Sequence, residues 1–398
     1  MRIALTAGLV ALLVLSSAVP AGTAAPARSA GPARSAPREA QPEGPGSSRA
    51  PAADLLALLD QYHEWSLQQN PTEASRRGDK RFGALLRDES PEAYAAREQF
   101  VRALRAELDA IDPTALADED RLNADLLAYE LDSFLADRPF HQEQIQLSSR
   151  SGPQIWLPQL ADTLVFTTER DYADYAARLE AIGPYIDQVI AQMRLGLAAG
   201  RVPPRVTLAG VVEQTRALAA AGVARAPESS PFYEPFAAHP PDDPLAGRAR
   251  AAIAGVVVPA FSRLADFLET EYVPRARESV GASEGIDGLD FYRAQLREHT
   301  TLDLSPDQVH EIGLAEVARL RAEMLETIAR TDFAARESLR GDALLAAFLE
   351  YLRTDPRFYH ATEADLLLGY RDIAKLIDAQ LPRLFGTLPR TPYGVRAM

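Results

Sequence analysis

Two His-Glu pairs, His63-Glu64 and His310-Glu311, are the residues whose types come nearest to metal chemistry. In a zinc-binding helix a second His follows one turn after the first, so that both rings share a face and the Glu lies beside the bound water. Neither pair has this second His, the other histidines show no ligand spacing, and the chain contains no cysteine. We therefore expect no metal ligand and no catalytic residue within these 398 residues.

The segment RLFGTLPRTPYGVRAM at 383–398 is a candidate for substrate binding. It has no helical period, and it carries Arg390, Tyr393 and Arg396 between its prolines and glycines. An arginine can hold a carboxylate through two parallel hydrogen bonds, and a tyrosine hydroxyl can donate to a developing oxyanion. The alternative, which we weigh equally, is a connecting loop with solvated arginines.

A second candidate is the irregular stretch 139–167, which is polar and aromatic and contains three prolines. Gln146, Arg150 and Trp156 could line a substrate groove there, with Trp156 as its apolar wall. Local packing of the loop is the interpretation that we favour. We also expect a short strand near 144–147 within this loop.

His310 and Glu316 could support a cleft from the helix predicted at 305–330. We favour instead a solvent-facing His and a Glu in an ordinary salt bridge, because carboxylates on helix surfaces are usually solvated. The net charge of −14 excludes nucleic acid as an expected partner, since no basic block is present to neutralise phosphates.

The elements that must position these residues are helices. Apolar residues recur at helical spacing, with Ser305-Pro306 and Gln308 forming a capping signal and Gly200 a C-terminal stop. We expect Gly183-Pro184 to break or kink one run. The predicted helices cover 54–69, 91–110, 118–135, 169–199, 206–224, 248–272, 289–299, 305–330, 340–354 and 362–381. The fold class is therefore all-α.

The N-terminus has the pattern of an export signal. Arg2 precedes a mostly apolar run, and small residues follow it, so residues 1–25 are predicted to be a signal peptide that is cleaved within 24–27. Residues 26–53 are rich in Pro, Ala and Ser and are predicted to be a disordered linker before a helical domain at 54–398. The mature protein should be secreted or periplasmic, with no membrane span left after cleavage.

Four segments resemble the bacterial domain of unknown function 885 family in their order along the chain. They are QQNPTEASRRGDKRFGALLRDES at 68–90, RDYADYAARLEAIGPYIDQVIAQMRLGLAAGRVPPRVTL at 170–208, GLDFYRAQLREHTTLDLSP at 288–306 and LPRLFGTLPRTPYGVRAM at 381–398. Members look like zinc peptidases, so the resemblance implies two packed helical lobes along a cleft and a peptide substrate. Zinc is expected in a complete family member.

The sequence departs from the family pattern in one respect. The family's metal motif, a His-Glu pair followed by Gly-His-His, does not occur in the 398 residues. We expect the chain to be the N-terminal scaffold and substrate-cleft portion of an exported zinc-dependent peptidase-like hydrolase, incomplete at its C-terminus and inactive as it stands. The alternative is a non-catalytic exported helical protein that binds a peptide or a partner.

Overall fold

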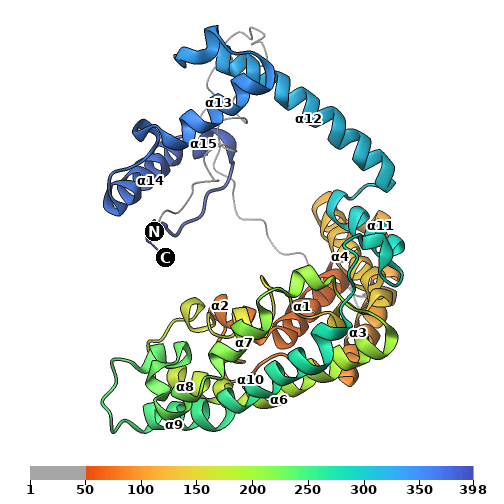
Figure 1. The fold of residues 1–398 in the computed structure, drawn as a ribbon. Coiled ribbons are helices and arrows are strands. Elements are labelled where there is room, and N and C mark those ends of the chain that lie inside the picture. The colour runs from red at the N-terminus through yellow and green to blue at the C-terminus, as the bar shows by residue number, and fades with distance from the viewer. Residues whose placement is uncertain (1–50, 398) are drawn as a thin grey trace, which may run out of the picture. The chain divides into compact units, whose positions relative to one another are not determined.

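A computed structural model describes residues 51–397 of the chain, and this range is built from helices (Figure 1). Within it no strand forms, and only two isolated β-bridges occur, between Ser148 and Ser151 and between Pro204 and Arg277. The all-α prediction is confirmed. The predicted signal peptide and all but the last three residues of the predicted linker lie outside the described range.

The helices follow one another with short 3₁₀ turns and loops between them. Their bounds are α1 Pro51–Gln69, α2 Pro71–Arg76, α3 Pro91–Asp109, α4 Asp118–Asp137, α5 Pro153–Trp156, α6 Glu169–Ala199, α7 Val211–Leu218, α8 Ala221–Arg225, α9 Pro244–Ala252, α10 Val258–Phe267, α11 Gly288–Thr300, α12 Pro306–Ala329, α13 Gly341–Thr354, α14 Glu363–Asp378 and α15 Leu381–Leu384.

Local sequence signals fix several helix ends. The Ser305 side chain accepts from the Gln308 backbone N–H, and the Gln308 side chain accepts from the Ser305 backbone N–H, so the predicted capping box opens α12. Gly200 ends α6 with φ of 75°, a conformation that glycine adopts without a Cβ clash. Helix α1 begins at Pro51 and not at Asp54, so the last three residues assigned to the linker are helical.

Helix continuity differs from the predictions at two places, and of the break or kink expected at Gly183-Pro184 the break is wrong. Helix α6 runs through Pro184 without a break, because the proline lies on the exposed side while Ile182 and Ile186 beside it are buried in the core. The helix predicted over 206–224 is instead divided into a 3₁₀ turn, α7 and α8. Gly210 has φ of 79° immediately before α7, and this left-handed residue interrupts the run.

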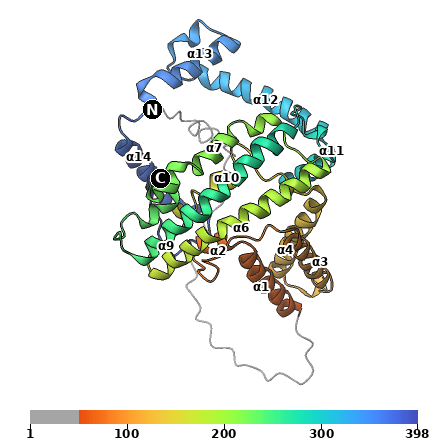
Figure 2. The ribbon, with the colours of Figure 1, turned by 60° about the horizontal axis from the view of Figure 1, so that its bottom comes forward.

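The buried apolar side chains form two clusters. The larger cluster joins α5, α6, α7, α9 and α10, of which α6, α7 and α10 lie side by side (Figure 2). The smaller cluster joins α1, α3 and α4 around Leu55, Leu104 and Leu131. Each cluster is an apolar interior of its own, in agreement with the expectation of two packed groups of helices.

The helical run Pro244–Arg275 is long and apolar enough to cross a membrane. More than half of its most apolar stretch is buried inside the protein, however, where Ile253, Phe261 and Leu264 belong to the larger core. A core helix of a soluble protein meets the same criteria.

A polar seam holds the segment 71–90 to α6. The Arg178 guanidinium is 2% exposed and donates to the backbone oxygens of Pro71, Phe82 and Leu85 and to the Ser75 hydroxyl, at 2.7–3.3 Å. About three and four turns further along α6, Gln188 and Gln192 bond to the backbone of Glu89 at 2.9 Å each. Because 71–90 joins α1 to α3, this seam connects the two cores.

We expect Arg178→Met to lower the free energy of unfolding by about 3 kcal/mol, because it removes four buried hydrogen bonds and leaves the Leu85 oxygen without a donor. Urea denaturation measures the change. The matched control is Arg248→Met, which removes an exposed ion pair between Arg248 of α9 and Glu180 of α6, and its expected loss is below about 1 kcal/mol. Equal losses in the two variants would show that the seam contributes little.

Asp171, at the start of α6, makes the stability of the folded protein depend on pH. Its carboxylate accepts from Lys80 and from the backbone N–H groups of Thr167 and Thr168. Burial opposes ionisation, but these hydrogen bonds outweigh it and hold the pKa of Asp171 well below its usual range. A depressed folded pKa contributes stability above the unfolded pKa of about 3.9 and loses it as the pH falls towards the folded value.

Asp171→Asn should therefore lower the melting temperature at pH 7, and the difference from the unmodified chain should shrink as the pH is taken from 5 down to 2. Calorimetric scans at several pH values measure this. Asp187→Asn serves as the control. Asp187 also lies on α6, and this substitution alters an exposed ion pair with Arg263 of α10. A difference that stays constant over this pH range contradicts the assignment.

Candidate functional site

The three predicted residues of the C-terminal segment lie at the surface. Arg390, Tyr393 and Arg396 are all exposed, and the Tyr393 hydroxyl donates to Asp378 at 2.8 Å. This bond raises the pKa of Tyr393 above its ordinary value. The hydroxyl thus anchors the tail to the end of α14, and a role for these residues in substrate binding stays a prediction.

The irregular stretch 139–167 is packed locally. Trp156 ends α5 and lies edge-to-face on Tyr185, with ring centroids 5.6 Å apart, so its ring packs against the larger core. The Gln146 side chain is half-buried, and Arg150 is exposed. The strand predicted near 144–147 is wrong, because a 3₁₀ turn occupies Gln142–Gln144. Substrate binding by these three residues also stays a prediction.

The two polar residues of α12 have ordinary surroundings. His310 is exposed, and Glu316 pairs with Arg319 at 2.6 Å one turn along the helix. The preferred interpretation of Glu316 as a salt-bridge residue is confirmed. Across residues 51–397, no three His, Asp or Glu side chains gather in a way that could hold a metal ion. The residues described here therefore do not fit a zinc site.

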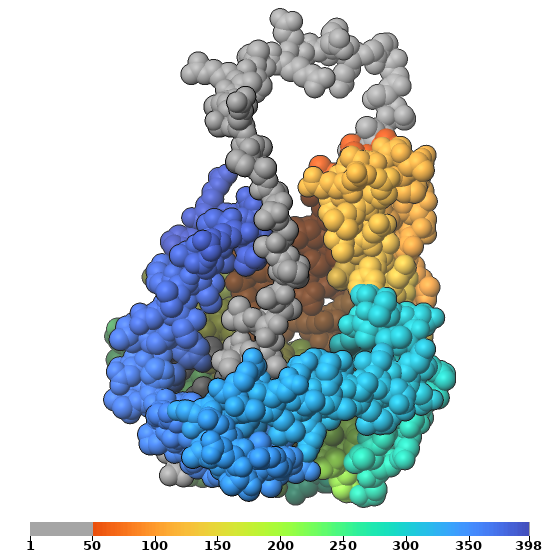
Figure 3. Space-filling view, turned by 90° about the horizontal axis from the view of Figure 1, so that it is seen from above, coloured from red at the N-terminus to blue at the C-terminus, as the bar shows by residue number. Residues whose placement is uncertain are grey.

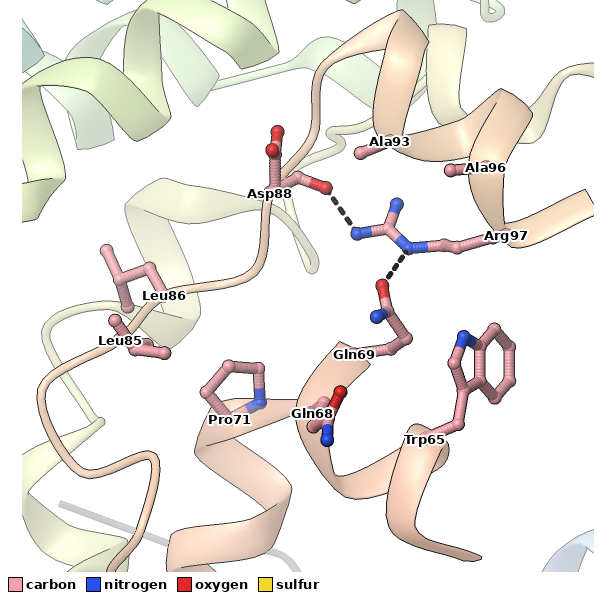
Figure 4. A pocket seen from close by; sticks show the side chains of 10 residues that line it. All are labelled: Trp65, Gln68, Gln69, Pro71, Leu85, Leu86, Asp88, Ala93, Ala96 and Arg97. Atoms are coloured by element: carbon pink, nitrogen blue, oxygen red, sulfur yellow. Dashed lines mark hydrogen bonds between the residues drawn. The ribbon is translucent and has the colours of Figure 1, made fainter. Parts of the chain in front are cut away.

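A pocket of about 370 Å³ lies between the end of α1, the start of α2 and the first turns of α3 (Figure 4). Its walls combine an aromatic ring, short aliphatic side chains and a few polar groups. The lining residues are Trp65, Gln68, Gln69, Pro71, Leu85, Leu86, Asp88, Ala93, Ala96 and Arg97. A volume of this size is within the range of small-molecule sites, and the walls expose polar and apolar surface in about equal measure.

Arg97 is the most unusual residue of the pocket, because its side chain is only 2% exposed. Its Nε donates to Gln69 Oε1 at 2.9 Å, and its Nη2 donates to the backbone oxygen of Asp88 (Figure 4). Its Nη1 is buried and has no hydrogen-bond partner among the described residues. The guanidinium thus donates hydrogen bonds only to neutral oxygens among the described residues.

The neighbouring arginines differ from Arg97 in this respect. Arg87 lies 3.6 Å from the Glu89 carboxylate and Arg138 lies 3.1 Å from that of Glu143, whereas Arg97 forms no ion pair within 51–397. The three guanidinium groups all face the Tyr94 ring, at 4.8–5.8 Å. Burial, and then the like charge of Arg87, lower the pKa of Arg97 below its ordinary value.

Sequence reasoning missed Arg97 and Arg178, although a signal for both exists. Arg97 lies in register with Val101, Leu104 and Leu108, which form the buried stripe of α3. Arg178 likewise falls on the buried face of α6. An arginine at a core position of an amphipathic helix must find buried acceptors, and this marks it for attention.

The C-terminal helices expose much apolar surface. Between residues 302 and 397 only Ile328 and Leu344 are buried apolar side chains. Figure 3 shows part of this region at the surface, coloured light to dark blue. The large apolar side chains of α12 and α14 that are about half exposed or more are Ile312, Leu314, Val317, Leu368, Tyr370, Ile373, Leu376 and Ile377. On α14, Tyr370, Ile373 and Ile377 follow one another at helical spacing, and exposed apolar surface of this kind marks interaction sites.

Comparison with protein families gives one match, which extends over residues 71–398 and so over most of the chain. The family is described as a bacterial protein of unknown function, DUF885. The chain belongs to this family. Among curated proteins, none matches it.

Two solved structures resemble this DUF885 chain in fold. A candidate lipoprotein from Colwellia psychrerythraea is 21% identical with a TM-score of 0.72, and the match covers 86% of this chain and 62% of that one. A candidate lipoprotein of unknown function from Shewanella oneidensis is 16% identical with a TM-score of 0.54, covering 86% and 59%. The chain thus spans about three fifths of the length of these proteins.

The apolar face of α14 leads to a prediction about self-association. Leu376 is 71% exposed on that face, and Leu376→Lys should reduce concentration-dependent association because it places a charge on the apolar surface. Sedimentation at increasing protein concentration measures the change, and circular dichroism should show unchanged helix content. Ala379→Lys adds the same charge at an exposed position that is not part of the apolar set, and it should have little effect. Equal effects of both lysines would point to net charge alone.

Proposed function

We propose that this chain is the N-terminal scaffold and substrate-cleft portion of an exported zinc-dependent peptidase-like hydrolase. The observation that carries the proposal is membership of the DUF885 family over residues 71–398. Two further observations support it. The solved relatives are longer than the region matched here, and α12 and α14 present apolar side chains that more polypeptide could cover.

The proposal gives this chain a binding task and no bond-breaking step. The described residues do not fit a zinc ion, so the metal would be held by residues outside this sequence. Zinc would supply an activated water in the complete hydrolase. The groups proposed for contact with a peptide substrate are Arg390, Tyr393 and Arg396 in the tail, and Gln146, Arg150 and Trp156 in the loop.

We also propose an exported location. The apolar run near Arg2 supports a signal peptide at 1–25, and the two solved relatives are named as candidate lipoproteins. The sequence has no cysteine, so a lipid attached through a cysteine thioether has no acceptor within these 398 residues. A secreted, periplasmic or cell-envelope protein is the form that the proposal favours.

Zinc content and peptide hydrolysis test whether this chain binds zinc or cleaves peptides by itself. The purified 398-residue chain should retain no stoichiometric zinc after dialysis and should not cleave a mixture of unblocked peptides, because it lacks a converging ligand set. Mass spectrometry of metal and of peptide products measures both. Tight stoichiometric zinc, or zinc-dependent cleavage by the chain itself, would contradict the proposal.

The genomic sequence after codon 398 separates the main proposal from its alternative. An in-frame continuation that encodes a His-Glu pair and Gly-His-His supports the hydrolase. A stop codon, combined with saturable peptide binding by the purified chain, supports a non-catalytic exported binding protein.

A further inference from the structure

We propose that the pocket between α1 and α3 binds a carboxylate that is carried on an apolar body, with Arg97 as the residue that recognises the charge. The free C-terminus of a peptide with an apolar last residue has this chemistry, and so does a free branched carboxylic acid. The peptide form rests on the proposed function, whereas the carboxylate chemistry does not.

The hydrogen bonding of the Arg97 guanidinium, and not the net charge of the pocket, favours an anionic ligand. Arg97 is 2% exposed and forms no ion pair within the described residues, while Arg87 and Arg138 beside it each have a carboxylate partner. A buried charge that forms no ion pair is costly, and a carboxylate ligand would relieve this by a charge-assisted hydrogen bond. Binding would then offset part of the free-energy cost of burying the Arg97 charge.

Unused hydrogen-bonding capacity lies beside the same charge. Nη1 of Arg97 is a buried donor with no partner, and a group of this kind in a native structure calls for an explanation such as a missing ligand. Nη1 is itself covered, so a wall side chain must turn aside for a ligand oxygen to reach it. Gln69 can do so, because its amide makes one hydrogen bond among the described residues, to Arg97 Nε.

The remaining walls suit an apolar body. Trp65, whose ring stacks on Phe100 at 4.5 Å, forms one side of the pocket, and Pro71 and Leu86 form another (Figure 4). The volume of about 370 Å³ is at the small end for ligand sites, so a single aliphatic side chain with its carboxylate is a suitable size.

Phosphate and other multiply charged anions fit this pocket less well. Arg97 is the one basic residue in the lining, and Asp88 contributes a carboxylate of its own. The Asp88 carboxylate is held by Ser90 and Gln188 at 2.8 and 3.0 Å and stays ionised, because these bonds outweigh the effect of its partial burial and lower its pKa. With one guanidinium and one carboxylate in its lining, the pocket offers a multiply charged anion no second cation to bind.

Fluorescence of Trp65 provides a direct test in the full chain. The sequence has two tryptophans, Trp65 and Trp156, so a Trp156→Phe background leaves Trp65 as the reporter. Titration with N-acetyl-leucine should give a saturable change, and N-acetyl-leucinamide, which lacks the charge, should bind about tenfold more weakly or worse. Added salt should weaken the first and not the second. Equal binding of both probes, or binding of neither, would overturn the proposal.

Variants in α3 separate binding at the pocket from binding elsewhere. Ala96→Leu fills the pocket without touching the charge and should abolish the response, whereas Ala95→Leu, at an exposed position outside the lining, should leave it unchanged. Arg97→Gln should abolish the preference for the carboxylate if it folds. If it does not fold, the Ala96 and Ala95 pair still decides the question, and identical responses of that pair contradict the site.

Two more probes identify the source of the carboxylate. A tripeptide that ends in leucine, compared with 4-methylpentanoate, shows whether the site prefers a peptide C-terminus or a free acid. Stronger binding of either supports the carboxylate chemistry, and stronger binding of the tripeptide supports its link to a peptide hydrolase. Neither zinc nor cleavage enters this measurement, so its failure leaves the proposed function standing, and failure of the proposed function leaves the carboxylate site standing.

Discussion

A single buried cation, Arg178, holds the two cores of this protein in register. The apolar interiors around α1, α3 and α4 and around α6 and α10 form separate clusters, and the segment 71–90 between them is irregular after the short helix α2. Arg178 donates to three backbone oxygens of this segment, among which that of Leu85 lies in its irregular part. The pocket depends on this arrangement, since Pro71 and Leu85, whose oxygens Arg178 binds, form part of its lining.

The helices were largely predictable because their signals are local. Ser305 with Gln308 and Gly200 set helix ends through contacts within one or two turns, and periodic apolar residues identified α1, α3, α6 and α12. The errors arose where tertiary burial competes with local preference. Pro184 stays inside α6 because its neighbours are buried, and Gly210 interrupts a run that its periodicity favoured.

The candidate site was much less predictable than the fold. Trp65 and Gln69 lie one turn apart on α1, whereas Arg97 belongs to α3 and follows Gln69 by 28 residues. No local spacing in the sequence predicts that Arg97 meets the other two. The sequence does place Arg97 on the apolar stripe of α3, but it cannot show which acceptors the guanidinium finds. The residues chosen from the tail and the loop were selected for chemical type, and type alone does not reveal that Trp156 packs on Tyr185.

The uneven distribution of buried side chains has a consequence for cooperativity. Helix α6 contributes thirteen buried residues and the polar seam, whereas α14 contributes none. Backbone amides of α6 can exchange with solvent only when the joined cores open together, while those of α14 exchange through inexpensive local fraying. The molecule therefore combines a body whose amides exchange slowly with a C-terminal region whose amides are less protected.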